Sequence, residues 1–309
     1  MRIVRNVHER VLDAPAAAVG ALVDRLSAPD DPLFPSPVWS PMAFDRPLQV
    51  GADGGHGPVR YAVTAYEPGR RVRFGFTPPE DGFHEITVEP LDGGRCRLRH
   101  VLESRMGPVD RLMWALAIRR VHGTVVEELF DNAELVATGA VARPVRRSPL
   151  VRLLQRVESE KATAAELPAG ASLARGAFEA PDFTDSWEIA LRPGMPRDVA
   201  AWRGVLPFPV VAHEGAELLL GKDAGHLDFR ASVLVEDERV TLSTVVRIHH
   251  RRGRLYFAVV RRFHPRVVRR MLRRAWRRRA LAAPSAGERE RTRAGAAGRT
   301  RAAGRTGRK

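Results

Sequence analysis

The sequence predicts an α+β protein in which an antiparallel sheet wraps around a long helix, followed by a second, smaller antiparallel α+β domain. Three observations predict this fold class. Residues 83–91 and 95–103 alternate between two kinds of side chain and flank the turn residues Asp92-Gly93-Gly94. A helix-period segment follows from residue 107, and further alternating segments begin near residue 181. Strands followed by a covering helix are typical of α+β architecture.

The first two alternating segments predict a hairpin with a defined register. Their apolar sides carry His84, Ile86, Val88, Cys96, Leu98, His100 and Leu102. A three-residue turn pairs Leu91 with Arg95 and places both apolar sides on the same face, whereas a two- or four-residue turn would separate them. In this register Ile86 faces His100, and His84 lies diagonally beside it on the buried face.

The long helix is expected to begin at Gly107-Pro108, since proline suits the first helical position. Its length of about 28 residues corresponds to about 40 Å at a rise of about 1.5 Å per residue. The expected buried stripe is Trp114, Ile118, Val121, Val125 and Leu129. His122 lies one step from this stripe.

The N-terminal part supplies the remaining elements of the first domain. Residues 2–12 predict a strand with Ile3, the Val4/Val7 region and Val11 available for burial, and Asp13 can cap the helix that follows. Five prolines between residues 29 and 41 predict a loop whose large apolar side chains cover a core or a pocket. Strands are expected at 59–67 and 71–77.

These features carry a resemblance to a known superfamily. The carrying segments are FHEITVEPLDGGRCRLRH, LESRMGP and WALAIRRVHGTVVEELFDNAE. On them, residues 1–140 resemble the START-like superfamily, also called SRPBCC or polyketide cyclase/dehydrase. The resemblance implies a helix-grip fold that holds a hydrophobic small molecule between helix and sheet. Some members of that superfamily cyclise or aromatise polyketides, and many only bind.

The second half predicts a linker, a second domain and a tail. Residues 141–180 form the linker with one short helix, residues 181–280 the second domain, and residues 281–309 a disordered Arg-rich tail. Strands are expected in ELLLG, HLDFRASVLV, RVTLSTVVRIHH and RLYFAVVRRF, with a last helix from Pro265. On PDFTDSWEIAL, LLLGKDAGHLDFRASV and VVRIHHRRGRLYFAVVRRFHPRVVRRMLRRA, this half resembles domain-of-unknown-function family 2867. Its element order suggests a second, shortened grip-like unit.

The net charge of +15 comes from the C-terminal end alone. Residues 251–309 hold 21 Lys and Arg against 2 Asp and Glu, whereas the other 250 residues hold 30 against 34. The single cysteine, Cys96, excludes an internal disulfide and fits a reducing compartment. With no signal-peptide pattern and no apolar run long enough for a transmembrane segment, the sequence predicts a cytoplasmic protein.

Three histidines expected to meet inside the first domain, His84, His100 and His122, are the candidate catalytic residues. Imidazole transfers protons near neutral pH, as cyclisation and dehydration require, and Arg60, Tyr61 and Tyr66 could supply an oxyanion partner. The alternative is that the histidines line an inert core. No metal site is expected, because carboxylates and cysteine are absent at ligand spacing. No cofactor is expected, because no glycine-rich phosphate loop follows a strand.

Large side chains from several elements are expected to line a ligand site in the first domain. They are Trp39, Phe44, Tyr61, Tyr66, Phe74, Phe76, Trp114 and Ile118. In the second domain, His226, Asp228 and Arg230 share one strand face, which is either a site or the solvated side of a sheet.

Three functions therefore remain open. The first is binding of a hydrophobic small molecule, polyketide- or lipid-like, in the helix-grip cavity. The second is a polyketide cyclase/aromatase or dehydratase that uses the histidines. The third is an interaction protein that contacts a polyanion, nucleic acid or an anionic membrane surface, through its C-terminal Arg-rich region. The alternative to the third function is that the Arg-rich helix from Pro265 packs on the second domain and exposes its arginines to solvent without binding a partner.

Overall fold

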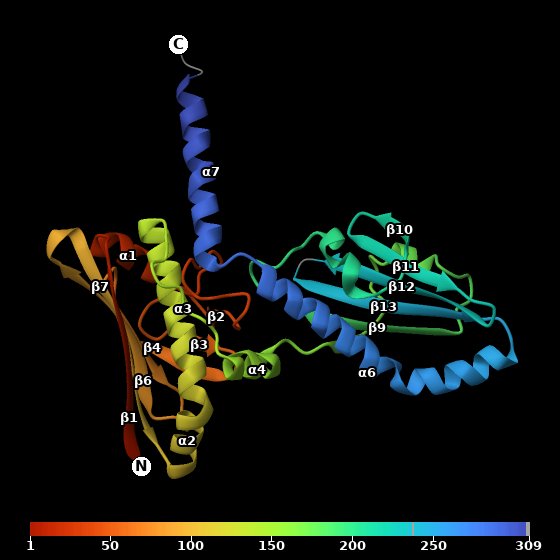
Figure 1. The fold of residues 1–309 in the computed structure, drawn as a ribbon, viewed down its shortest axis with the longest axis horizontal. Helices are drawn as coiled ribbons and strands as arrows, with labels where there is room; N and C mark the ends of the chain where they lie inside the picture. Colours follow the sequence, from red (N-terminus) through yellow and green to blue (C-terminus); the bar gives the residue numbers. More distant parts are fainter. Residues whose placement is uncertain (237, 307–309) are drawn as a thin grey trace. The chain divides into compact units, whose positions relative to one another are not determined.

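A computed structural model describes residues 1–236 and 238–306 (Figure 1). The chain divides into two compact units. Unit 1 consists of Met1–Glu158 and Pro284–Lys309, and unit 2 consists of Ser159–Ala283. The boundary lies inside the segment 141–180 that the sequence predicts to be a linker. Unit 1 is therefore built from two separate stretches of sequence.

Unit 1 contains a seven-stranded antiparallel sheet with strand order β1-β7-β6-β5-β4-β3-β2. The strands are β1 Arg2–Leu12, β2 Met42–Phe44, β3 Asp53–His56, β4 Val59–Glu67, β5 Arg71–Phe76, β6 Gly82–Leu91 and β7 Arg95–Met106. The helices are α1 Ala16–Val23, α2 Pro108–Met113, α3 Arg119–Thr138, α4 Pro149–Glu158 and α7 Ala286–Thr306. One long helical stretch, from α2 through α3, lies across the sheet (Figure 1).

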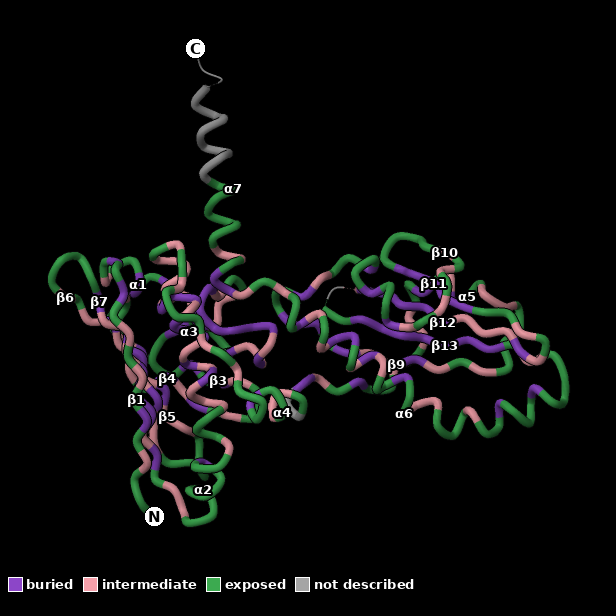
Figure 2. Tube along the Cα trace, in the orientation of Figure 1, coloured by how far each residue is buried: buried purple, intermediate pink, exposed green. Residues whose placement is uncertain are grey.

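The β6–β7 hairpin confirms the predicted register. Asp92–Gly94 forms the turn, and Gly93 and Gly94 take the left-handed φ values of 74° and 72° that favour glycine. Leu91 pairs with Arg95, and Ile86 pairs with His100. The inward face of both strands is buried, as the alternation predicts (Figure 2).

The long helix contains a π-helical turn, Trp114–Ile118, between α2 and α3. A π turn holds more residues than an α turn, so it rotates the following residues relative to the preceding ones. The predicted stripe is therefore only partly correct. Trp114 and Leu129 are buried, but Ile118 is 46% exposed. The helix ends at Thr138, and Gly139 caps it with a left-handed φ of 93°.

Strand β1 turns the opposite face inward from the one predicted. Ile3, Val7 and Val11 are 60%, 41% and 48% exposed. The cause is its pairing with β7, in which His8 is opposite His100. Directly opposed residues share a face, and His100 faces the interior, so the even-numbered residues of β1 face inward. The buried side of this strand is therefore largely polar.

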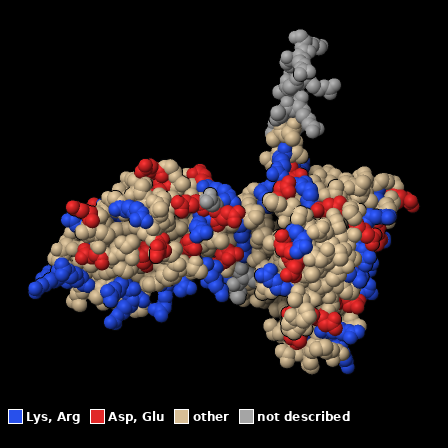
Figure 3. All heavy atoms as spheres, turned by 180° about the vertical axis from the view of Figure 1, so that it is seen from behind, with Lys and Arg blue, Asp and Glu red and all other residues tan. Residues whose placement is uncertain are grey.

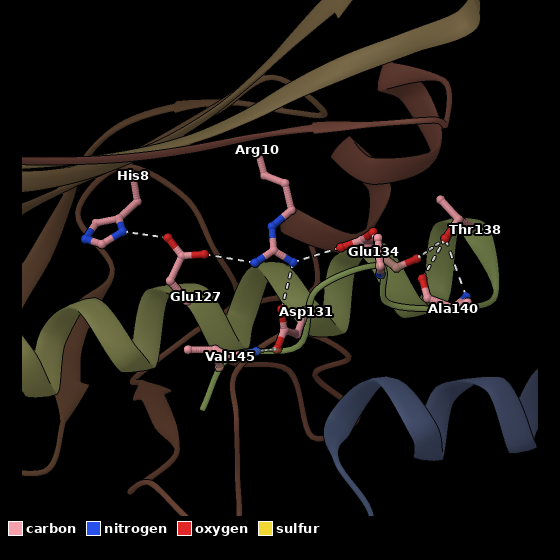
Figure 4. A network of polar contacts seen from close by, with 9 residues as sticks. His8, Arg10, Glu127, Asp131, Glu134, Thr138, Ala140 and Val145 are labelled. Atoms are coloured by element: carbon pink, nitrogen blue, oxygen red, sulfur yellow. Dashed lines mark hydrogen bonds and ion pairs between the residues drawn. The ribbon is translucent and has the colours of Figure 1, made fainter. Parts of the chain in front are cut away.

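Arg10 on that inner face forms ion pairs with a row of carboxylates on α3 (Figure 4). Its Nη1 donates to Asp131 at 2.7 Å and to Glu134 at 2.8 Å. Its Nη2 donates to Glu127 at 2.8 Å, and His8 Nδ1 lies 2.7 Å from the same carboxylate. The hydrogen bond with His8, together with Arg10, holds the pKa of Glu127 below its ordinary value. These contacts fasten the edge strand to the helix.

The proline-rich loop before β2 packs over the core, as predicted for its large apolar side chains. Leu33, Phe34 and Trp39 are buried. Trp39 Nε1 donates to Glu128 Oε2 at 2.7 Å, and Asn132 Nδ2 donates to the Leu33 carbonyl at 2.9 Å. Polar groups of α3 thus hold the loop in place.

Helix α7 occupies most of the segment 281–309 for which the sequence predicts disorder, and residues 307–309 lie outside the described residues. Ion pairs explain the difference. Arg25 Nη1 donates to Glu290 Oε1 at 2.7 Å, and Arg293 Nη1 donates to Asp30 Oδ2 at 2.6 Å. The Gly287 backbone N–H also donates to Asn132 Oδ1 at 3.2 Å. This helix has no apolar face to bury, and contacts with charged residues elsewhere in unit 1 hold it instead.

Unit 2 contains a six-stranded antiparallel sheet with order β10-β11-β12-β13-β9-β8. The strands are β8 Thr163–Ala165, β9 Phe183–Ala190, β10 Val210–Glu214, β11 Glu217–Asp223, β12 Leu227–Glu236 and β13 Arg239–Ile248. Helices α5 Ser172–Arg175 and α6 Arg251–Ala282, and the 3-10 segment Val199–Val205, complete it. The two antiparallel sheets with their helices confirm the predicted α+β class. Trp202 and Trp276 lie fully buried in the core of unit 2.

The predicted strand RLYFAVVRRF is wrong, because residues 254–263 belong to α6. The His250 side chain accepts from the Gly253 N–H at 3.4 Å and caps the helix, which then continues through Pro265. Buried Gly253, Phe257 and Val268 lie on the side of the helix that packs. An apolar run of this length does not distinguish a strand from a helix by periodicity alone.

We expect Arg10→Ala to lower the free energy of unfolding by about 2–3 kcal/mol, because it leaves three neighbouring carboxylates without their shared cation. Arg10→Lys should recover only part of the loss, since an ammonium lacks the planar fork. Urea unfolding checks both variants. Arg5→Ala, at an exposed position of the same strand, is the control and should change stability by no more than about 0.5 kcal/mol. Equal effects at the two positions would contradict the structural role of Arg10.

Candidate functional site

The structure brings the three predicted histidines together inside unit 1. His84 lies on β6, His100 on β7 and His122 on α3. The ring centroids of His84 and His100 are 5.6 Å apart, and those of His100 and His122 are 5.1 Å apart. His84 and His100 are 7% and 4% exposed. The hairpin register sets the first distance, and the packing of α3 on the sheet sets the second.

Aromatic side chains surround this cluster. Tyr61 and Phe74, both fully buried, have ring centroids 4.6 and 4.7 Å from that of His84. Phe76 lies 5.6 Å from His84, and Phe44 lies 5.6 Å from Phe74. These four predicted residues therefore form one continuous aromatic wall with the histidine. On the helix side, the predicted Trp114 lies 5.6 Å from His122.

Other predicted residues point elsewhere. The Tyr66 hydroxyl donates to Asp24 Oδ1 at 3.0 Å. Burial of this phenol, together with the neighbouring carboxylate, raises its pKa to about 12. Trp39 hydrogen bonds to Glu128 rather than to the cluster. Ile118 and Arg60 are exposed. Of the predicted site residues, the three histidines, the aromatic wall and Trp114 therefore lie in one group, and the others lie outside it.

Two further histidines join the cluster and were not predicted. The His8 ring centroid lies 6.3 Å from that of His122. His56 Nδ1 lies 2.9 Å from the Tyr61 hydroxyl, and its ring centroid is 5.7 Å from that of Tyr61. The alternation along residues 2–12 would have placed His8 in the interior if the inward face of this strand had been known. His56 lies in a glycine-rich stretch, where alternation gives no signal.

The buried histidines are neutral at pH 7. Burial, with the neighbouring imidazoles adding to it, lowers the pKa values of His84, His100 and His122 well below the ordinary range. Burial lowers the pKa of His56 to about 4. It also raises the pKa of the Tyr61 hydroxyl, so this group stays protonated. A neutral imidazole offers one donor and one acceptor nitrogen.

Each of the three central histidines has a buried ring nitrogen without a hydrogen-bond partner within the described residues: His84 Nε2, His100 Nδ1 and His122 Nδ1. A buried polar atom left without a partner costs about 1–3 kcal/mol. Three such atoms on adjacent rings are exceptional in a folded protein, where buried polar groups are almost always paired.

Metal and thiol chemistry have little support among these side chains. Within residues 1–236 and 238–306, no group of three or more His, Cys, Asp or Glu is arranged to hold a metal ion. Cys96 is a buried free thiol, and burial raises its pKa. A thiol with a raised pKa is a poor nucleophile.

The polar ladder predicted in unit 2 does not converge on one point. His226 packs edge-on against Tyr256, with centroids 4.9 Å apart. Asp228 Oδ2 pairs with His249 at 3.0 Å. Arg230 Nη1 donates to Asp223 Oδ1 at 2.6 Å. The three predicted side chains are thus engaged by three different partners.

The geometry of unit 1 defines a helix-grip α+β domain with a buried histidine cluster between its sheet and its long helix. Residues 5–136 match the family model described as "Polyketide cyclase / dehydrase and lipid transport". Residues 192–271 match the model described as "Protein of unknown function (DUF2867)". Both matches confirm the resemblances drawn from the sequence.

Solved structures similar to this chain include CalU16 from Micromonospora echinospora, with 14% identity, 51% of this chain and 91% of that chain covered, and a TM-score of 0.34. A protein from Thermobifida fusca has 18% identity, with 48% of this chain and 100% of that chain covered, and a TM-score of 0.36. A norcoclaurine synthase point mutant from Thalictrum flavum, in complex with a transition state analogue, has 14% identity, coverages of 45% and 98%, and a TM-score of 0.35. The search of curated proteins gave no match. Among the described residues, no helix has both the length and the apolar character needed to cross a bilayer.

We expect the stability of the protein to fall as the pH is lowered from 7 to 5. The folded-state pKa values of these histidines lie below the ordinary value of 6.5. Below pH 6.5 the unfolded chain therefore binds protons that the folded chain does not, and protonation favours unfolding. Each such histidine contributes up to about 1.4 kcal/mol per pH unit within this window.

Urea unfolding at a series of pH values measures this slope. His84→Leu should reduce the slope by the contribution of about one proton, whereas His213→Leu, at an exposed position of unit 2, should leave it unchanged. A stability that is independent of pH between 7 and 5 would show that the buried histidines titrate normally.

Proposed function

We propose that unit 1 binds a hydrophobic small molecule between its sheet and α3, and that His84, His100 and His122 hydrogen bond to it. The observation that carries this proposal is the set of three buried ring nitrogens without partners. A ligand that supplies those partners removes an energetic cost already present in the ligand-free protein. The description of the matching family model, which includes lipid transport, supports the same function.

The surroundings indicate the chemistry of the ligand. Rings of Phe44, Tyr61, Phe74 and Phe76 favour an apolar or aromatic body. The imidazoles are neutral, so they favour a carbonyl or hydroxyl group over a carboxylate, which a cation would bind better. A mostly apolar molecule with one or two neutral oxygens, as in a polyketide or a lipid-like compound, fits both conditions.

Ligand entry requires side chains to move, because the three nitrogens are completely covered in this structure. Trp114 packs beside His122 and belongs to the π-helical turn. π turns are less stable than α-helix and often occur at functional sites. We infer that the ligand enters beside Trp114.

Catalysis by a cyclase or dehydratase is the second candidate. The observation in its favour is the position of His100 between two other imidazoles, all in the neutral form that accepts a proton. Their lowered pKa values make them weak bases and disfavour a protonated imidazole as the acid at pH 7. The Tyr61 hydroxyl, which stays protonated and lies in the same wall, is the candidate proton donor.

Native mass spectrometry of the freshly purified full chain tests binding directly. A co-purified apolar molecule of defined mass supports the proposal. Incubation of His84→Leu/His100→Leu with the same molecule should then give at least about tenfold weaker binding, which corresponds to about 1.4 kcal/mol.

The same two substitutions should stabilise the ligand-free protein. Leucine has nearly the volume of histidine and carries no polar atom, so each change removes an unsatisfied nitrogen worth about 1–3 kcal/mol. Thermal unfolding of ligand-free wild type and variants measures this effect. Tyr66→Phe, at a tyrosine engaged with Asp24, is the control and should not affect ligand binding. Destabilised histidine variants with unaltered ligand binding would assign the cluster to structure alone.

A further inference from the structure

The first part of α6, residues 251–270, is fastened to the sheet of unit 2 along one side only. A Cβ at Gly253 would lie 2.1 Å from the His226 carbonyl oxygen, so the helix approaches the sheet closely there. The ring of Phe257 packs against that of Phe183 at 5.0 Å. His264 Nε2 lies 3.1 Å from Asp185 Oδ1. These contacts determine which side of the helix faces away from the sheet.

The exposed part of the helix carries arginines and an uncovered row of large apolar side chains. The residues of this row recur at steps of four, so they form one stripe along the helix. The stripe consists of Leu255 (73% exposed), Val259 (57%), Phe263 (58%) and Val267 (50%). A contiguous row of large apolar side chains on a surface marks an interaction site. We call this row the α6 stripe.

Arginines border the α6 stripe. Helix α6 contains 13 arginines and no acidic residue. Arg252 precedes Leu255 by three residues, and Arg266 and Arg270 follow Phe263 and Val267 by three, so each lies next to the stripe. All three are exposed. Lys and Arg side chains gather along the edge of unit 2 that carries this helix (Figure 3).

The partner of this surface must match both the arginines and the apolar side chains of the α6 stripe. Nucleic acid would neutralise the arginines but would leave the aliphatic part of the stripe without a partner. A second copy of the helix would cover the stripe but would bring two arginine-rich surfaces together, which is unfavourable. An anionic bilayer surface satisfies both features, because its headgroups pair with arginine and its acyl region receives the apolar side chains.

We propose that α6 is a membrane-surface helix, which lays the α6 stripe into a bilayer rich in anionic phospholipid while its bordering arginines contact the headgroups. The helix lies along the surface and does not span the bilayer, in keeping with its charge and with the finding on membrane-spanning helices. This function belongs to unit 2 and does not depend on ligand binding by unit 1.

Vesicle flotation with the full-length chain tests the proposal. We expect binding to phosphatidylcholine vesicles that contain phosphatidylglycerol and little or no binding to phosphatidylcholine alone. Val259→Ser/Phe263→Ser should weaken partitioning by at least about tenfold, because two apolar side chains no longer enter the bilayer. Arg266→Glu/Arg270→Glu should weaken it by a similar factor through charge reversal.

Ile3→Ser/Val11→Ser is the matched control, since it removes two exposed apolar side chains from β1 of unit 1, and it should bind as the wild type does. All substituted residues are exposed, and circular dichroism verifies that each variant is folded. The proposal is overturned by any of three results: no binding to anionic vesicles at low salt, unchanged binding by the serine variant of the stripe, or DNA binding at least as strong as vesicle binding. Self-association that the serine substitutions abolish, without vesicle binding, would likewise overturn it and assign the stripe to a dimer.

Discussion

The register between β6 and β7 is the constraint on which the interior of unit 1 depends. Gly93 and Gly94 adopt left-handed backbone conformations that allow a turn of three residues. A turn one residue shorter or longer would move every second side chain of one strand to the opposite face of the sheet. His84 and His100 would then lie on different sides, and the cluster with His122 would not exist.

The same register, carried across to β1, explains why this edge strand has a polar inner face. Because His8 is opposite His100, Arg10 must also point inward. The acidic row on α3 makes that position favourable, since Glu127, Asp131 and Glu134 surround the guanidinium (Figure 4). The space between the sheet and α3 therefore contains two different environments. One holds the ion pairs of Arg10, and the other is apolar and aromatic. The histidines that lie in the second environment lose their charge.

Much of this arrangement could be predicted from the sequence. Alternation and turn composition together gave the hairpin, its register and the proximity of three histidines, because these are local properties of residues 83–103 and of one helix. The inner face of β1 could not be read in the same way. The apolar residues of β1 suggest that the odd-numbered side chains are buried. The pairing of β1 with β7 instead turns the even-numbered side chains inward, and this pairing is not visible in the sequence of β1.

The remaining differences have similar physical origins. The π turn at Trp114–Ile118 interrupts the helical period, so the sequence pattern predicts a buried Ile118, whereas the structure exposes it. The segment 254–263 is compatible with a strand or a helix until the cap at His250 is seen. Helix α7 is held by Arg25, Asp30 and Asn132, which lie far away in sequence. No local pattern in an Ala-, Gly- and Arg-rich segment can report such distant partners.

The docking of α7 has a consequence for the order in which the molecule is completed. Glu290 reaches its partner Arg25 only after the ribosome has made the whole of unit 2, since residues 159–283 lie between the two parts of unit 1. During synthesis, the sheet of unit 1 and its long helix must therefore persist without their last helix while more than a hundred residues are added. Premature termination within unit 2 would leave Arg25 and Asn132 without these partners, so a truncated chain would be weakened in the unit that appears, from its first 158 residues, to be intact.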